Sequence, residues 1–350
     1  MKISKYISQV VIAAGMLAAI PLTSMAGNPD RAGSAGASQL LINPWARGNG
    51  LSNSNMASIT GIESTFLNVA GLAYVEKTEL MFSNLQYFVG SGISINSLGF
   101  GQQVGESGVI GITVTALSFG DIGITTEQLP EGGIGSFRPS QANIGISYAK
   151  EFSNSIFGGI TMRIVSESIS NVRAQGVSFD AGIKYVSGDN DQLKFGISLR
   201  NVGPPMRYSG DGLTVTSVLG SGTSLTTNMR SEKYELPSMV NIGLSYDFLL
   251  SEESKLTANG QFTSNSFTQD QFGFGAEFSW KERVQLRAGY LYEKDVTNAD
   301  LRMTALSGPS AGLSLQIPAG SNGSMLGVDY SYRVTNPFSG THGIGVHITL

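Results

Sequence analysis

Hydrophobic and polar residues alternate along most of this chain. From position 78 to the end, apolar residues occupy every second position for about ten residues at a time, and a polar turn follows each stretch. A clear case is the alternation of Ala142, Ile144, Ile146 and Tyr148 with Asn143, Gly145, Ser147 and Ala149. The same period recurs in residues 177–185, 193–199, 240–248, 272–280, 284–292 and 326–332. Because side chains alternate between the two faces of a strand, the pattern predicts β-strands with one apolar face.

The length and regular spacing of these stretches favour a membrane barrel. We predict an all-β fold, a transmembrane antiparallel β-barrel of about 14 strands, because bacterial single-chain barrels have even strand numbers. Aromatic residues near strand ends fit an interfacial girdle; they are Tyr148, Tyr185, Tyr246, Tyr292 and Tyr332. A soluble β-sandwich is the alternative, but its outward faces would carry more charge and its strands would be shorter.

The end of the chain also reads as a strand, whereas one earlier stretch is doubtful. Residues 343–350 alternate Gly343, Gly345 and His347 with apolar positions and stop on an apolar residue, which is typical of outer-membrane barrels. Residues 119–128 fit the pattern poorly, and we expect a loop or an inserted segment there.

Two long segments do not fit a barrel wall. Residues 27–75 lack steady alternation, and we expect them to fold into the lumen as a hatch before the barrel of residues 76–350. Residues 203–235 form the longest other unpatterned stretch, rich in Gly, Ser and Thr. Long loops of such barrels face the cell exterior, and loops of this length are often functional or disordered.

Composition supports a membrane barrel and excludes several other classes. Charged residues make up 14% of the chain, against roughly a quarter in ordinary soluble domains. The chain has 45 glycines, no cysteine and a net charge of −4, with no basic stripe. Disulfides and cysteine chemistry are therefore absent, and nucleic acid is not an expected partner.

The first 26 residues read as an export signal. Lys2 and Lys5 precede an apolar stretch at residues 10–20, and Ser24-Met25-Ala26 fits a cleavage site. The apolar stretch is too short to cross about 30 Å of hydrocarbon. Since the rest of the chain has no apolar run of that length, we expect a protein of the outer membrane that spans it as a barrel.

Signs of enzyme chemistry are weak. The only histidines, His342 and His347, lie an odd number of positions apart on one predicted strand and so face opposite sides. They cannot share a metal ion, and the chain has no nucleophile elbow for a Ser-His-Asp hydrolase. We expect no catalytic residue, no metal and no cofactor.

Charged residues on the predicted luminal faces suggest a salt-bridge network rather than an ion pathway, because a plugged barrel of this size must fill its interior. The candidate cations are Lys184, Lys194, Arg163, Arg200, Arg287 and Arg333, and their candidate partners are Asp180, Asp329 and Glu277.

Residues 32–47, which run from Ala32 to Pro44-Trp45-Ala46-Arg47, resemble the opening of the PorV/PorQ family of outer-membrane proteins. Residues 68–73 resemble that family's Asn-Pro-Ala-Gly-Leu-Ala element, with Val69 in place of proline. Shorter matches occur at residues 200–203, 235–238, 287–290 and 340–342. The resemblance implies a 14-stranded barrel with an N-terminal hatch, similar to long-chain fatty-acid transporters. It places the hatch motif at Asn43, Pro44, Arg47, Asn68, Gly71 and Leu72.

The family resemblance implies a component of the type IX secretion system, the main functional hypothesis. Such a protein binds the C-terminal signal domains of secreted proteins, docks on a larger translocon barrel and passes cargo to surface-attachment proteins. The candidate cargo-binding residues of the long loop are Pro204, Met206, Tyr208, Leu213 and Tyr234. Outer-membrane lipid would surround the barrel. The alternative, by fold analogy, is a transporter of small hydrophobic molecules with an apolar luminal pocket bounded by the hatch.

Overall fold

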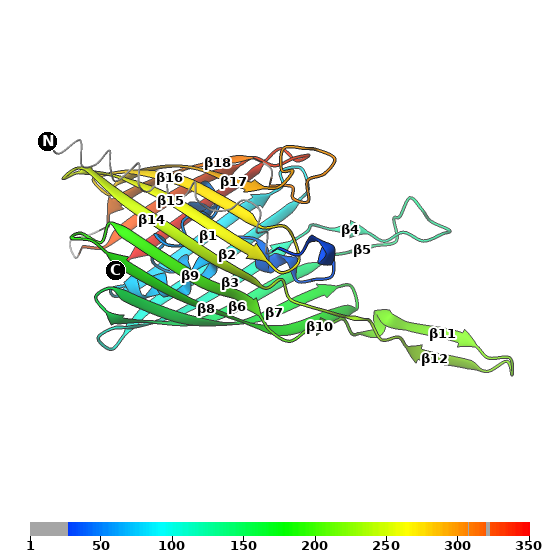
Figure 1. Ribbon diagram of the computed structural model, residues 1–350. Helices are drawn as coiled ribbons and strands as arrows, with labels where there is room; N and C mark the ends of the chain where they lie inside the picture. The colour runs from blue at the N-terminus through cyan, green and yellow to red at the C-terminus, as the bar shows by residue number, and fades with distance from the viewer. Residues whose placement is uncertain (1–26, 307, 320–322) are drawn as a thin grey trace.

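The computed structural model describes residues 27–306, 308–319 and 323–350, so the predicted signal peptide lies outside the described residues. The chain forms a closed antiparallel barrel of 14 strands (Figure 1). Each strand pairs with the next barrel strand along the chain, and β20 closes the barrel on β1. The prediction of the fold class is confirmed, strand number included.

The barrel strands carry the following bounds: β1 Thr78–Tyr87, β2 Ile93–Val104, β3 Gly108–Ser118, β6 Ser140–Ser153, β7 Ile156–Ile169, β8 Val172–Ser187, β9 Leu193–Val202, β14 Met239–Ser251, β15 Ser254–Asn265, β16 Gln271–Trp280, β17 Val284–Glu293, β18 Pro309–Pro318, β19 Met325–Arg333 and β20 Thr341–Thr349.

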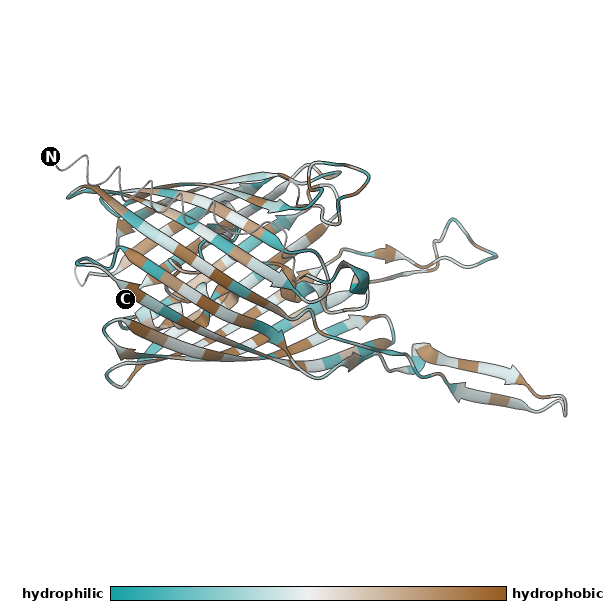
Figure 2. Ribbon diagram, viewed as in Figure 1, coloured by the Kyte–Doolittle hydropathy of each residue, from teal (hydrophilic) through white to brown (hydrophobic). Residues whose placement is uncertain are grey.

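The period of two in the sequence separates a lipid-type outer face from a filled interior. In the first half of β14 buried and exposed residues alternate, and the exposed positions there are Val240, Ile242 and Leu244. Ile160 and Ile183 on other strands are 64% and 59% exposed. The apolar residues form repeated bands along the wall (Figure 2). Such a wall suits a hydrocarbon surrounding and not water. None of the helices in the described part of the chain is long and apolar enough to cross a membrane.

The two ends of the barrel differ. The short-turn end carries tight connections such as residues 105–107 and 154–155, together with the start of β1 and the end of β20. The long-loop end carries two long connections that project beyond the wall (Figure 1). Residues 119–139 hold only the small pair β4 Ile122–Gly123 and β5 Ser136–Phe137, outside the barrel sheet, as we expected for residues 119–128.

The second long connection, residues 203–238, contains more structure than its composition suggests. It holds the pair β10 Met206–Arg207 and β13 Lys233–Tyr234, the 3-10 helix η4 Asp211–Leu213, and the hairpin of β11 Thr214–Val218 and β12 Ser224–Asn228. Every residue of β11 and β12 is exposed. The hairpin therefore stands free of the barrel.

Residues 27–75 pack inside the barrel as short helices and turns. They form the 3-10 helices η1 Pro29–Arg31, η2 Ser38–Leu41 and η3 Val69–Tyr74 and the helices α2 Ala46–Gly50 and α3 Ser64–Leu67. Trp45, Met56, Ile62 and Leu72 from this segment form the main core and pack against inward-facing Val109 of the wall. We call residues 27–75 the N-terminal segment.

The barrel wall is lined with glycine where the N-terminal segment passes. A Cβ at Gly289 would lie 2.3 Å from the carbonyl carbon of Leu51, and one at Gly243 would lie 2.4 Å from the Met56 side chain. Such distances leave no room for any side chain. This glycine belt comprises Gly99, Gly111, Gly159, Gly182, Gly196, Gly243, Gly275, Gly289, Gly312 and Gly343. It accounts for part of the high glycine content and fixes the path of the segment.

Candidate functional site

The first half of the predicted hatch motif holds a tight turn together. The Asn43 side chain donates to Asn53 Oδ1 at 2.7 Å and accepts the backbone N–H of Trp45 at 3.0 Å. Pro44 is buried beside them. Arg47 forms an ion pair with Glu63 at 3.2 Å, within the same N-terminal segment. These residues shape the segment.

The second half of the motif anchors the segment to the wall. Asn68 Oδ1 accepts the N–H of Ala70 at 3.2 Å and caps η3, so the helix starts without the proline that Val69 replaces. Asn68 Nδ2 donates to the carbonyl of Ile183 on β8 at 3.1 Å. A Cβ at Gly71 would lie 2.4 Å from the carbonyl oxygen of Ile59, and Leu72 is fully buried.

Buried carboxylates and cations surround the Arg47–Glu63 pair. Burial raises the pKa of Glu63 to about 7, and the nearby carboxylates of Asp329 and Glu79 act in the same direction, against Arg47 and Arg287. The pKa of Arg47 lies above its usual value because four carboxylates surround it. Arg47 therefore stays charged, while Glu63 exchanges its proton near neutral pH.

The predicted salt-bridge network is only partly formed. Arg163 pairs with Asp180 at 3.0 Å and Arg287 pairs with Glu277, as expected. Within the residues that the structure describes, Lys184 and Arg200 form no ion pair with a carboxylate. They donate instead to the carbonyls of Ile59 at 3.2 Å and Leu40 at 3.3 Å. This corrects the sequence prediction, and the reason is that irregular backbone inside the lumen needs buried donors.

Two further pairings also differ from the sequence prediction. Lys194 pairs with Asp247 at 2.5 Å, a partner that the prediction did not include. Asp329 pairs with His347 at 3.0 Å instead of a lysine or arginine. His342 lies on the outer face, where its ring bonds the Tyr330 hydroxyl at 2.8 Å, so the two histidines face opposite sides as predicted. In the described part of the chain, no group of three or more His, Asp or Glu residues is arranged to hold a metal ion.

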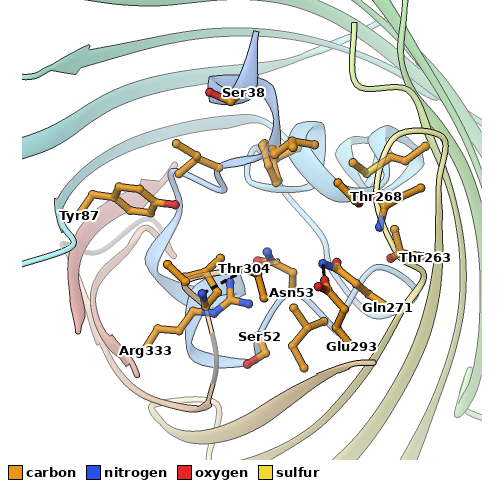
Figure 3. Close-up of a pocket in the computed structure, with 18 of the residues that line it drawn as sticks. Ser38, Ser52, Asn53, Tyr87, Thr263, Thr268, Gln271, Glu293, Thr304 and Arg333 are labelled. Atoms are coloured by element: carbon orange, nitrogen blue, oxygen red, sulfur yellow. Dashed lines mark hydrogen bonds between the residues drawn. The ribbon is translucent and has the colours of Figure 1, made fainter. Parts of the chain in front are cut away.

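A cavity of about 510 Å³ opens in the long-loop half of the lumen (Figure 3). The N-terminal segment supplies its floor through Ile42, Ser52 and Phe66, and the loop of residues 303–306 lies beside it. Leu117 and Phe119 extend the apolar surface on one wall. Its volume is in the range of sites for small organic ligands.

Polar and charged side chains also line the cavity. Gln271 donates to Glu293 at 2.7 Å, which satisfies one of the carboxylate oxygens (Figure 3). Arg200 stacks over the ring of Phe66 with 4.1 Å between guanidinium carbon and ring centroid. Arg333 is 3% exposed, and its Nε has no hydrogen-bond partner in the described ranges of the chain. Among the described residues, neither arginine forms an ion pair with a carboxylate. The cavity thus joins an apolar surface to buried cations.

The five predicted loop residues do not form one surface. Met206 is buried against Leu40. Tyr208 and Tyr234 both donate to Glu167 on β7, at 2.6 and 2.7 Å, and burial with this carboxylate raises the pKa of Tyr208 to about 12. Three of the five therefore bind the loop to the barrel. Only Pro204 is exposed, and Leu213 is half-buried at the base of the hairpin.

Sequence reasoning missed the cavity residues and the free hairpin. The cavity gathers side chains from Ser38 to Arg333, which no local motif connects. The sequence did set the hairpin apart from its surroundings, since residues 212–229 contain no charged residue. Alternation of Thr and Val in residues 214–216 is a strand pattern that we read as loop.

The fold of this barrel is similar to that of several solved structures. The toluene transporter TodX of Pseudomonas putida matches with a TM-score of 0.54 and 11% identity, over 88% of this chain and 97% of that one. The toluene transporter TbuX of Ralstonia pickettii gives 0.51 and 13%, over 86% and 96%. A FadL homologue of Pseudomonas aeruginosa gives 0.51 and 11%, over 87% and 96%. Identities this low show a shared fold and nothing finer.

No family model and no curated protein matches the chain. The resemblance to the PorV/PorQ family therefore stays a prediction, whereas the likeness to fatty-acid transporter barrels has structural support.

Proposed function

We propose that this protein is an outer-membrane transporter of small hydrophobic molecules. The observation that carries the proposal is the cavity of about 510 Å³ inside the lumen, bounded by the N-terminal segment and partly apolar. The solved structures of similar fold include two toluene transporters, which supports the same class of cargo. This was the alternative in the sequence analysis, and it now replaces the secretion hypothesis as the main one.

The chemistry of the cavity narrows the class of ligand. Ile42, Phe66 and Leu117 offer an apolar surface for a hydrocarbon body. Arg333, which also lines the cavity, is a buried cation that forms no ion pair among the described residues, and its burial is costly unless an anion approaches it. We expect ligands with an apolar body, and a preference for those that end in an anionic group.

The N-terminal segment would act as the hatch of this transporter. It closes the lumen below the cavity. Its backbone carbonyls accept hydrogen bonds from cations of the wall such as Lys184, and it lies in close contact with the glycine belt. A molecule that enters from the long-loop end therefore cannot continue along the barrel axis unless this segment changes its position.

Accumulation of a labelled alkylbenzene and the matching alkyl carboxylate in cells tests this proposal. Cells that make the protein in an outer membrane rich in lipopolysaccharide should accumulate both compounds faster than cells without it. Equal rates in the two strains would contradict a transport function.

The secretion-system hypothesis remains a second proposal because of the free hairpin. The uncharged, fully exposed β11–β12 pair has two open edges, a surface on which another protein strand can add. The partners would be a secreted protein with a C-terminal signal domain and a larger translocon barrel. Affinity purification of the tagged protein from native outer membranes tests this role. Recovery of such partners would support it, and recovery of the barrel alone would contradict it.

A further inference from the structure

Three exposed basic residues lie close together at the long-loop end, Arg173 on the wall strand β8 and Arg207 and Lys233 on the adjoining β10–β13 pair. Ala174, Met206 and Tyr234 point inward, since the first two lie in one buried cluster and Tyr234 bonds the luminal Glu167. Their neighbours Arg173, Arg207 and Lys233 alternate with them and are exposed. We call these three residues the basic patch.

The strand register brings the patch residues together. Arg207 lies directly opposite Lys233 in the β10–β13 pair. Arg173 pairs with Ser209, two residues from Arg207, through backbone bonds of 2.8 and 2.9 Å. Directly opposed side chains have Cβ atoms about 5 Å apart and diagonal neighbours lie about 7–8 Å apart.

The three patch residues are free of ion pairs among the described residues. By contrast, Arg31 pairs with Glu235 and Arg138 with Asp121, both at the same end of the barrel. Like charges directly opposite each other destabilise a pair of strands, so an external anion at this place would relieve the repulsion.

The level of the patch matches a lipid headgroup. On β7 and β8 the outward apolar wall reaches Ile164, which pairs with Val177. Beyond it the outward residues become polar, and Arg173 stands four positions further, about 13 Å along the strand. A tilted strand shortens this height, and long basic side chains reach back toward the interface. The cations thus stand just above the hydrocarbon belt.

We propose that the basic patch of Arg173, Arg207 and Lys233 binds the phosphorylated headgroup of an anionic glycolipid in the outer leaflet. Long loops of such barrels face the cell exterior, so this end lies in the outer leaflet. Two or three clustered cations match the paired phosphates of such a headgroup, and the apolar wall below accommodates its acyl chains. The inference uses the membrane placement of the barrel and not its transport activity.

Titration of bisphosphorylated lipid A into the purified protein in detergent tests the assignment. The variant R173Q/R207Q/K233Q should bind it more weakly, by roughly five-fold for each charge removed. The control K150Q/R283Q/K294Q removes three exposed basic residues elsewhere and should bind like the wild type. Loss of heat-modifiable migration on a gel would show that a variant has not folded, and the salt dependence of wild-type binding then serves instead.

Three results would overturn the proposal. The first is equal binding by the patch variant and the wild type, or, if the variant does not fold, wild-type binding that salt leaves unchanged. The second is equal binding of dephosphorylated lipid A, which would show that only the acyl chains matter. The third is full displacement of the lipid by inorganic phosphate at millimolar concentration, which would indicate a site for a free anion.

Discussion

The two halves of the lumen are built in opposite ways. Around the glycine belt, residues of the N-terminal segment such as Leu51 and Met56 approach the wall so closely that no side chain fits between them. In the long-loop half the wall bears full-sized side chains such as Leu117 and Arg333, yet space for a ligand remains. Small residues thus mark the half of the lumen that the N-terminal segment fills, which we call the filled half. Large residues mark the half that contains the cavity, which we call the open half.

Two long irregular segments of the chain also differ in how much of their surface is buried. The N-terminal segment carries apolar residues such as Trp45 and Met56 that become fully buried, and its backbone carbonyls receive bonds from the wall. The β11–β12 hairpin carries Thr and Ser with a few apolar residues, and every residue of its two strands is exposed. The amount of apolar surface available for burial decides which segment folds into the barrel.

The largest expected effect comes from adding a side chain where the wall and the N-terminal segment are in close contact. Gly289→Ala places a Cβ against the backbone of Leu51, and we expect a loss of about 1–3 kcal/mol in stability. The N-terminal segment should also become accessible to protease, and the barrel should conduct ions in planar bilayers. Gly260→Ala is the matched control, because its nearest atom is 4.0 Å away. A Gly289→Ala barrel that resists protease and does not conduct ions would contradict close contact between the wall and the N-terminal segment at this position.

An effect of pH on stability, of similar size, is expected within the filled half. The pKa of Glu63 is about 7 in the folded protein and near 4.5 when exposed, so the folded state holds this proton more tightly. The resulting stability, up to about 3 kcal/mol, is complete below pH 4.5 and is lost as the pH rises through 7.

Thermal unfolding of Glu63→Gln in detergent between about pH 5 and about pH 8 checks this sign. The wild-type Tm should fall across this range, and the variant should show a flatter profile. Glu232→Gln, on an exposed loop, is the control and should keep the wild-type profile. A slope that persists in Glu63→Gln would assign the pH dependence to other groups.

A smaller effect is expected in the open half. Arg333→Gln removes the cation without a carboxylate partner, so binding of an alkyl carboxylate should weaken roughly ten-fold. Binding of the matching alkylbenzene should not change, because it makes no ionic contact. Equilibrium dialysis with both compounds measures the difference, and equal losses for the two would show that Arg333 only shapes the cavity.

The smallest effect concerns the free hairpin. Replacing residues 214–228 by two glycines should change neither the Tm nor ligand binding, since the N–H of Met229 already bonds the carbonyl of Leu213 at 2.9 Å. A wider deletion of residues 206–232 would remove the buried Met206 and the Tyr208–Glu167 bond. A drop in Tm for the short deletion would mean that the hairpin packs on the barrel after all.

The wall could be predicted from the sequence, whereas the lumen could not. Strands such as β14 and β17 follow from a local period of two that lipid and the filled lumen jointly impose. The course of the N-terminal segment depends on contacts such as Asn68 with Ile183, more than a hundred residues apart. The inward glycines of many strands, such as Gly243 and Gly289, were an available sign of close packing.

The cavity could not be predicted from the sequence for the same reason. Arg333 looked like one more member of a salt-bridge network, because sequence shows which face a residue takes but not which partner lies across the lumen. The partners of the loop residues could not be predicted either, since Tyr208 and Tyr234 both donate hydrogen bonds to Glu167 on a distant strand.

Binding of a small apolar probe to a barrel with its cavity filled tests the central claim most directly. Leu291 faces the cavity from β17, and Leu286 on the same strand faces outward at 52% exposure. We predict that Leu291→Trp abolishes saturable binding of an alkylbenzene in equilibrium dialysis, while Leu286→Trp binds it like the wild type. Unchanged binding by Leu291→Trp, or absence of saturable binding by the wild type, would contradict a ligand site in the open half of the lumen.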